Sequence, residues 1–152
     1  MREGVFFMVK KMIEMDENKN MYETLKFLLE DLTKQSNDIK NAYKHMYDNC
    51  KEYDKEIFQR MYTNGVKHYK MLKELLNTLY KMDYNDENET IKSYKKYDAE
   101  KCIMDTYDIL DDYTKLYTNI EGKDIYKDMI FEIIQDLQKN ISMLNLVYMG
   151  EE

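Results

Sequence analysis

The sequence predicts an all-α protein: an antiparallel four-helix bundle made of two helical hairpins joined by one crossover. Three observations support this prediction. The 152 residues include no proline and only four glycines, so few residues interrupt helices. Apolar residues recur at steps of three and four over four long stretches, as on the buried face of an amphipathic helix. A polar segment, residues 83–98, separates these stretches into two pairs.

The first hairpin, residues 20–82, contains two predicted helices. The first helix covers roughly residues 20–49, and Ser36 alone interrupts its apolar series of Leu25, Leu28, Leu32, Ile39, Tyr43 and Met46. The second helix has an unbroken series of Phe58, Met61, Gly65, His68, Leu72, Leu75, Leu79 and Met82. Gly65 and His68 are therefore predicted to lie on the stripe that faces the core.

The second hairpin, residues 99–149, follows the predicted crossover. Its first helix carries Ile103, Thr106, Ile109, Tyr113, Leu116 and Ile120. Its second helix carries an unbroken series of Tyr126, Ile130, Ile133, Leu137, Asn140, Leu144 and Val147. Residues 20–149 are thus expected to form a single domain, long enough to bury a core. Residues 1–19 are expected to be an N-terminal extension.

Composition narrows the function classes. The chain has 23 Lys and Arg against 30 Asp and Glu, a formal net charge of −7, which disfavours broad contact with nucleic acid. Two cysteines, Cys50 and Cys102, are too few for a disulfide framework or a zinc site, and they favour a reducing cytoplasm. The apolar core of the N-terminal segment, Val5 to Val9, is too short to span a membrane. We therefore expect a cytoplasmic protein without nucleic-acid or membrane partners.

The two predicted hairpins also resemble each other in sequence. Residues 37–49 (NDIKNAYKHMYDN) align with residues 107–119 (YDILDDYTKLYTN) at a constant shift of 70. Residues 67–72 (KHYKML) align with residues 139–144 (KNISML) at a shift of 72. The matches keep the heptad register and indicate an internal repeat, although a composition rich in Tyr and Asn is an alternative source of such identities. The first alignment pairs Asp38 with Asp108, Ile39 with Ile109, and Tyr43 with Tyr113.

A two-hairpin repeat with a histidine in mid-helix resembles the ferritin-like superfamily, especially the small bacterial rubrerythrin-like and ferritin-like-domain proteins. The resemblance covers roughly residues 22–148. HYKMLKELL (68–76) is similar to the family's His followed by Leu-rich turns, and SNDIKNAYKHMY (36–47) is similar to the segment from a ligand Glu to a Tyr two turns later. The resemblance implies a bundle centre where two Glu and two Glu-x-x-His pairs hold two metal ions.

Carried over residue by residue, this resemblance assigns the ligand positions to Ser36, Gly65, His68, Thr106, Leu137 and Asn140. Only His68 retains a ligand side chain. One imidazole with two hydroxyls and an amide cannot offset the desolvation of two metal ions, so we expect a degenerate site with no metal and no cofactor. The polar members are expected to hydrogen-bond to one another or to a trapped water, because buried polar groups need partners.

Other site chemistries stay open. Asp38, Asp108 and His68 could form a rearranged mononuclear metal site, a cofactor could occupy the core, or His68 could act as a general base beside Gly65. His45 is expected to lie on the surface. So is an acidic run on the third helix, which could also engage a basic partner: Asp105, Asp108, Asp111 and Asp112.

The sequence therefore predicts a non-enzymatic protein that binds or regulates another protein, either a bacterial accessory protein or a phage or mobile-element inhibitor of a host system. The alternative is a metal- or cofactor-binding ferritin-like protein with a rearranged site around His68. Aromatic residues outside the core stripes could form a homodimer surface or hold a partner helix: Tyr47, Tyr53, Tyr62, Tyr69 and Tyr107.

Overall fold

The computed structural model describes residues 17–85, 94, 96–120 and 124–151. These residues form four α-helices and one short 3-10 helix: α2 (Glu17–Asn49), η1 (Glu52–Asp54), α3 (Lys55–Tyr80), α4 (Ala99–Asn119) and α5 (Asp124–Glu151). The predicted fold class, an all-α four-helix bundle, is confirmed. Among the described helices, none combines the length and the apolar composition that a membrane span needs.

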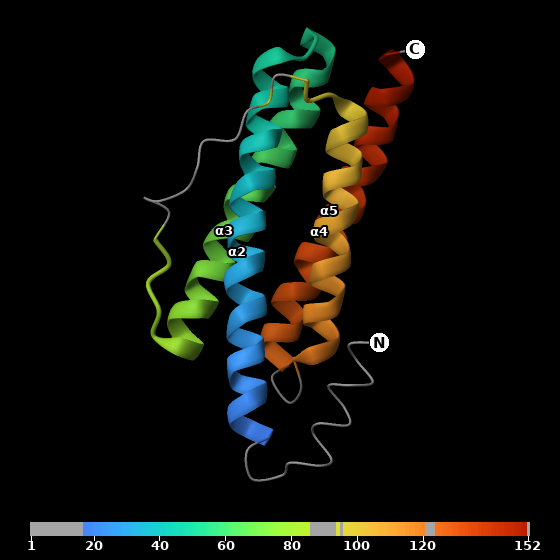
Figure 1. The fold of residues 1–152 in the computed structure, drawn as a ribbon. Coiled ribbons are helices and arrows are strands. Elements are labelled where there is room, and N and C mark those ends of the chain that lie inside the picture. The colour runs from blue at the N-terminus through green and yellow to red at the C-terminus, as the bar shows by residue number, and fades with distance from the viewer. Residues whose placement is uncertain (1–16, 86–93, 95, 121–123, 152) are drawn as a thin grey trace.

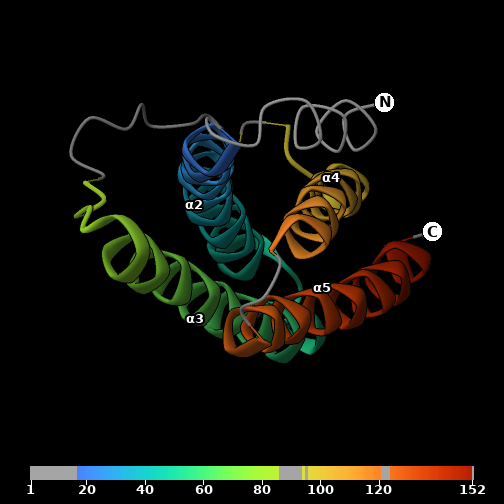
Figure 2. The same cartoon turned by 90° about the horizontal axis from the view of Figure 1, so that it is seen from below.

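The helices pack so that each one contacts two neighbours. Figure 1 shows α2 and α3 side by side and running in opposite directions, with α4 and α5 arranged in the same way. In the end-on view of Figure 2, α2 lies next to α3 and α4, and α5 completes the four-sided bundle opposite α2. α3 ends and α4 begins at opposite ends of the bundle, as the predicted crossover requires.

Local signals set the helix ends. The αL conformation of Lys81 (φ 53°) ends α3, and its N–H donates to the carbonyl of Asn77 at 2.8 Å. The Asp98 side chain caps α4 by accepting from the backbone N–H of Lys101 at 2.9 Å. α2 begins at Glu17, so residues 17–19, which we assigned to the extension, are helical. Residues 1–16, and residues 86–93 and 95 of the crossover, lie outside the described residues.

The predicted apolar stripes form the core. Phe58, Met61 and Leu72 of α3 are fully buried, as are Ile133 and Leu144 of α5. Each such side chain contributes roughly 1.5–3 kcal/mol when it leaves water. Stripe residues near the ends of the helices are only half-buried: Leu25, Leu28, Leu79, Met82, Ile103 and Tyr126.

Candidate functional site

All six positions that correspond to metal-ligand positions are buried inside the bundle. They are Ser36 on α2, Gly65 and His68 on α3, Thr106 on α4, and Leu137 and Asn140 on α5. The polar ones do not form a single cluster, however. Hydrogen bonds divide them into a network between α2, α4 and α5 and a separate group between α3 and α5.

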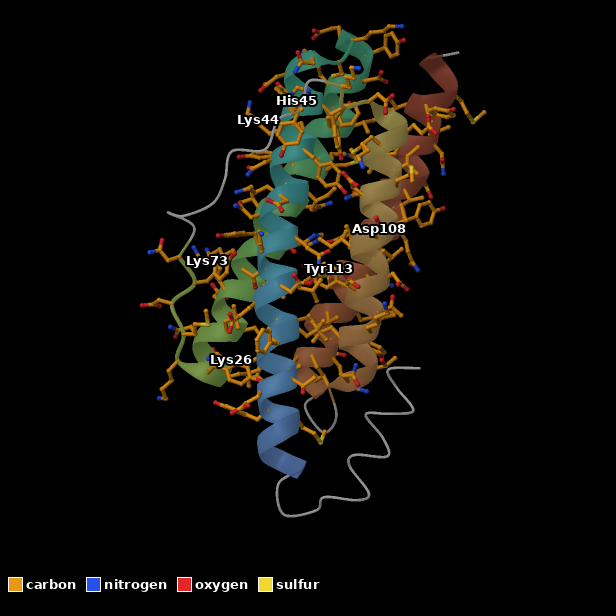
Figure 3. All side chains as sticks on the ribbon, in the orientation of Figure 1. Lys26, Lys44, His45, Lys73, Asp108 and Tyr113 are labelled. Atoms are coloured by element: carbon orange, nitrogen blue, oxygen red, sulfur yellow. The ribbon has the colours of Figure 1, made fainter. Side chains whose placement is uncertain are left out.

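The first group, here the midplane network, consists of Ser36, Tyr43, Thr106, Tyr113 and Asn140. Ser36 Oγ of α2 is hydrogen-bonded to the Tyr113 hydroxyl of α4, and the Tyr43 hydroxyl of α2 is hydrogen-bonded to Thr106 Oγ1 of α4 at 2.8 Å. Each bond therefore joins a small hydroxyl on one helix to a tyrosine on the other. Ser36 and Thr106 are 70 residues apart, and so are Tyr43 and Tyr113, so the internal repeat relates the two bonds. Figure 3 labels Tyr113 near the middle of the bundle.

The donor directions in the larger half of the network follow from its bonds. Thr106 Oγ1 donates its only proton to the carbonyl of Cys102 at 2.8 Å, so it accepts from the Tyr43 hydroxyl. The Tyr43 oxygen in turn accepts from Asn140 Nδ2 at 3.4 Å. Asn140 Oδ1 is buried without a hydrogen-bond partner among the described residues. Asn140 thus depends on Tyr43 for its side-chain hydrogen bond.

The titratable groups of this network are held neutral. Burial raises the pKa of Tyr43 and of Tyr113 well above the usual range of a phenol. Burial also raises the pKa of the neighbouring Cys102 thiol to about 12. At neutral pH the network therefore offers protonated phenols, hydroxyls and an amide beside the protonated Cys102 thiol, and none of these groups is suited to act as a general base. A di-metal centre does not fit this donor set, because it contains no carboxylate.

His68 belongs to the second group, and our expectation that it joins the other polar positions was wrong. Its Nε2–H donates to Asp136 Oδ2 on α5 at 2.8 Å, and Lys67 Nζ lies 2.9 Å from the same oxygen. Burial lowers the pKa of His68, although the Asp136 carboxylate opposes this effect. The imidazole is therefore neutral at pH 7. Asp136 precedes the stripe position Leu137, and its spacing does not distinguish it from the charged residues of the surface.

The alternative ligands Asp38, Asp108 and His68 are not brought together. Asp38 and Asp108 line a small cavity of about 160 Å³ between α2 and α4, whereas His68 is hydrogen-bonded at the contact of α3 with α5. Among the residues that the structure describes, no three His, Cys, Asp or Glu side chains gather as a metal ion requires. The acidic run on α4 is partly exposed, as expected for a solvated helix face.

Gly65 marks a close approach of α3 to α2. A Cβ atom at this position would lie 3.1 Å from Lys40 Cβ and 3.2 Å from Lys40 Cα. These distances are shorter than ordinary van der Waals contact. The glycine therefore allows the two helices to pack closely at this point, and Lys40 of α2 fills the space beside it, which leaves no room for a ligand.

The aromatic residues outside the core stripes differ in exposure. Tyr53 and Tyr107 are exposed, as predicted, and Tyr47 and Tyr62 are half-buried. Tyr69 is buried, so its assignment to a surface was wrong.

His45 is half-buried, and its ring stacks on Tyr94 with centroids 4.9 Å apart.

Tyr69 forms part of a groove of about 640 Å³ on the outer side of α3. Lys40 Nζ and Lys73 Nζ lie over its ring, 4.8 Å and 5.0 Å from the centroid. The Tyr84 ring meets it edge-on at a centroid distance of 6.2 Å. Figure 3 shows Lys73 on the side of α3 away from α4 and α5. The other lining residues include apolar, cationic, polar and acidic side chains: Val66, Met82, Lys70, Asn77, Thr78, Glu74 and Asp83.

Comparisons with protein-family models, with curated proteins and with solved structures find no match for the chain.

Proposed function

We propose that the protein is a non-enzymatic bundle that binds another protein and holds a helix of that partner in the groove along α3. The observation that supports this proposal is the groove itself, which combines apolar side chains with three lysines and two acidic residues in a chain of net charge −7. The settings we favour are a bacterial accessory protein and a phage or mobile-element inhibitor of a host system. In both, the protein would act by covering a surface of its partner.

The shape of the groove favours a helical partner. Its α3 residues run from Val66 to Thr78, which is about 18 Å at a rise of about 1.5 Å per residue. A partner helix of about three turns fits along this length with its apolar face on Val66 and Met82. Lysines outnumber acidic residues in the groove by three to two, since Glu74 and Asp83 also line it. Acidic residues on the flanks of the partner helix would meet Lys70 and Lys73, which favours an acidic amphipathic helix.

The chemistry of the midplane network supports a structural role for the core. Its hydroxyls are hydrogen-bonded to one another, and its phenols stay protonated at neutral pH. Networks of this kind specify a helix register, because a shifted helix would leave buried polar groups without partners. We therefore assign recognition to the outer surface and register to the centre.

We also propose that the bundle is ferritin-like and derives from a duplicated hairpin with degenerate metal-ligand positions. The support is the relation of the bonds Ser36–Tyr113 and Tyr43–Thr106 by the 70-residue repeat. The free Cys50 and Cys102 thiols fit the reducing cytoplasm that we propose for the protein.

The alternative function, metal or cofactor binding around His68, has one observation in its favour. His68 and Asp136 form a partly buried imidazole–carboxylate pair, and both are common metal ligands. Metal analysis of protein purified without chelators tests it. Stoichiometric iron, manganese or zinc that disappears in His68→Ala would establish the alternative in place of our proposal.

Capture from an extract of the native host tests the groove. The bait proteins are the wild-type chain, the groove variant Lys70→Glu/Lys73→Glu, and the control variant Lys26→Glu/Lys44→Glu. The control makes the same change of charge on α2, at the half-buried Lys26 and the exposed Lys44 (Figure 3). We expect the wild type and the control to retain a partner that the groove variant loses, with equal melting temperatures. Equal capture by all three proteins would refute the proposal.

A further inference from the structure

The outward face of α5 carries a second stripe of residues in addition to the stripe in the core. Its members follow steps of four and three, as the positions of a coiled-coil seam do. All of them are exposed: Phe131, Gln135, Gln138, Ser142, Asn145 and Met149. Leu146 lies beside the stripe and is 65% exposed. We call this stripe, including Leu146, the outer seam.

The outer seam contains no charged residue, in a chain in which 35% of residues are charged, although the exposed Glu132 and Lys139 border it on the side of Leu146. Residues 140–150 contain no Asp, Glu, Lys or Arg. Asp136, on the same helix, is engaged by His68 and Lys67 of α3. Exposed positions on α4 include Glu100, Asp108 and Asp111, so its solvent face is acidic. Contact along the stripe from Phe131 to Met149 therefore desolvates no charge of its own members, and Glu132 at its border is paired with Lys67.

We infer that the outer seam joins two copies of the chain in an antiparallel, two-fold symmetric dimer. Each copy has a formal charge of −7, so two copies repel each other, and this repulsion is smallest when an uncharged face lies between them. The outer seam supplies such a face. Because it is the same surface on both copies, it closes a dimer and does not extend into a filament.

The spacing of the outer seam is symmetric about the level of residue 140. An antiparallel pairing at that level places Phe131 against the partner's Met149, so that apolar side chains pack at both ends. Gln135 then lies opposite the partner's Asn145, where the two amides can hydrogen-bond, and Gln138 lies opposite the partner's Ser142. Antiparallel helices also align their dipoles favourably, which parallel helices do not.

The size of the outer seam sets the expected affinity. From Phe131 to Met149 it is about 27 Å long at about 1.5 Å per residue. Its three large apolar side chains and its polar centre form a small contact surface, and protein interfaces that bury less than about 1,200 Å² of surface are weak. We expect a dissociation constant of about 10 μM, within an order of magnitude. This dimer is independent of the groove on α3, because the two surfaces lie on different helices.

Sedimentation equilibrium of the full chain tests the dimer. The seam variant Leu146→Glu/Met149→Glu is compared with the control variant Met104→Glu/Tyr107→Glu, which alters similarly exposed side chains on α4. We expect a loss of affinity of at least about tenfold in the seam variant and an unchanged affinity in the control. Gln138→Glu, which removes no apolar area, is a second variant that should weaken the dimer. A monomeric wild type at roughly 200 μM, or a seam variant that still dimerises, would overturn the inference.

Disulfide trapping tests the direction of pairing, in a Cys50→Ser background because that thiol is half-exposed. Phe131→Cys mixed with Met149→Cys should give a cross-linked heterodimer, whereas neither variant alone should cross-link. Parallel pairing predicts the opposite pattern, in which each variant cross-links to itself. That pattern would overturn the antiparallel arrangement.

Discussion

Replacement of Tyr43 by Phe should lower the stability of the bundle more than the same replacement of Tyr113, although the repeat makes the two positions equivalent. Tyr43 is 1% exposed, and its hydroxyl donates to Thr106 and accepts from Asn140. Without that hydroxyl the Asn140 amide, which is fully buried, loses its side-chain hydrogen bond. An unsatisfied buried polar group costs about 1–3 kcal/mol, so we expect Tyr43→Phe to destabilise by about 2–3 kcal/mol.

Tyr113→Phe is the matched control. Its hydroxyl bonds to Ser36, which can instead turn toward the carbonyl one turn earlier in α2. Thr33 in the same helix already makes such a bond, to the carbonyl of Leu29 at 2.6 Å. We therefore expect a loss of only about 1 kcal/mol for this variant.

Urea denaturation followed by circular dichroism measures both variants under the same conditions. A third variant, Tyr43→Phe/Asn140→Leu, removes the amide together with its partner and should recover at least half of the lost stability. The explanation would be refuted if Tyr113→Phe destabilised as much as Tyr43→Phe, or if the Asn140 replacement recovered nothing.

Two further predictions concern α3. Because burial lowers the pKa of His68 in the folded state, the unfolded chain binds the proton more readily, and the free energy of unfolding should fall as the pH drops below about 6.5. Urea denaturation at pH 7.5 and 5.5 should show this loss in the wild type and not in His68→Gln. Equal pH dependence of the two proteins would refute the prediction. Gly65→Ala should not stabilise the bundle by the roughly 1 kcal/mol that the higher helix propensity of alanine would give, because the new Cβ would lie 3.1 Å from Lys40 Cβ. A melting temperature raised by the full amount would show that α2 and α3 can move apart without a loss of stability.

Apolar spacing was sufficient to predict the helices and much of what they bury. Gly65, His68 and Asn140 interrupt the apolar character of their stripes but not the step of three and four, and all three are buried. The periodicity determines which face of a helix is turned inward. It does not determine which neighbour a polar side chain meets, because that depends on how the four helices are arranged.

The hydrogen-bond partners were therefore the part that the sequence left unpredicted. The alignment at a shift of 70 paired Tyr43 with Tyr113, and its extension by one residue pairs Ser36 with Thr106, which was the available signal for the crossed bonds. Tyr69 was misassigned because its burial depends on side chains outside its own helix. Lys40 of α2 and Tyr84, beyond the end of α3, lie against its ring.

The most direct test of a protein-binding function compares capture of the host partner by His68→Leu with capture by Lys70→Glu/Lys73→Glu. Asp136 keeps its contact with Lys67 in His68→Leu, so the bundle should remain folded. If recognition resides in the groove and the core is structural, His68→Leu retains the partner and the groove variant loses it. Loss of partner binding or of biological activity in His68→Leu, with an unchanged or raised melting temperature, would show that the centre binds a ligand or performs chemistry, and would contradict the proposal.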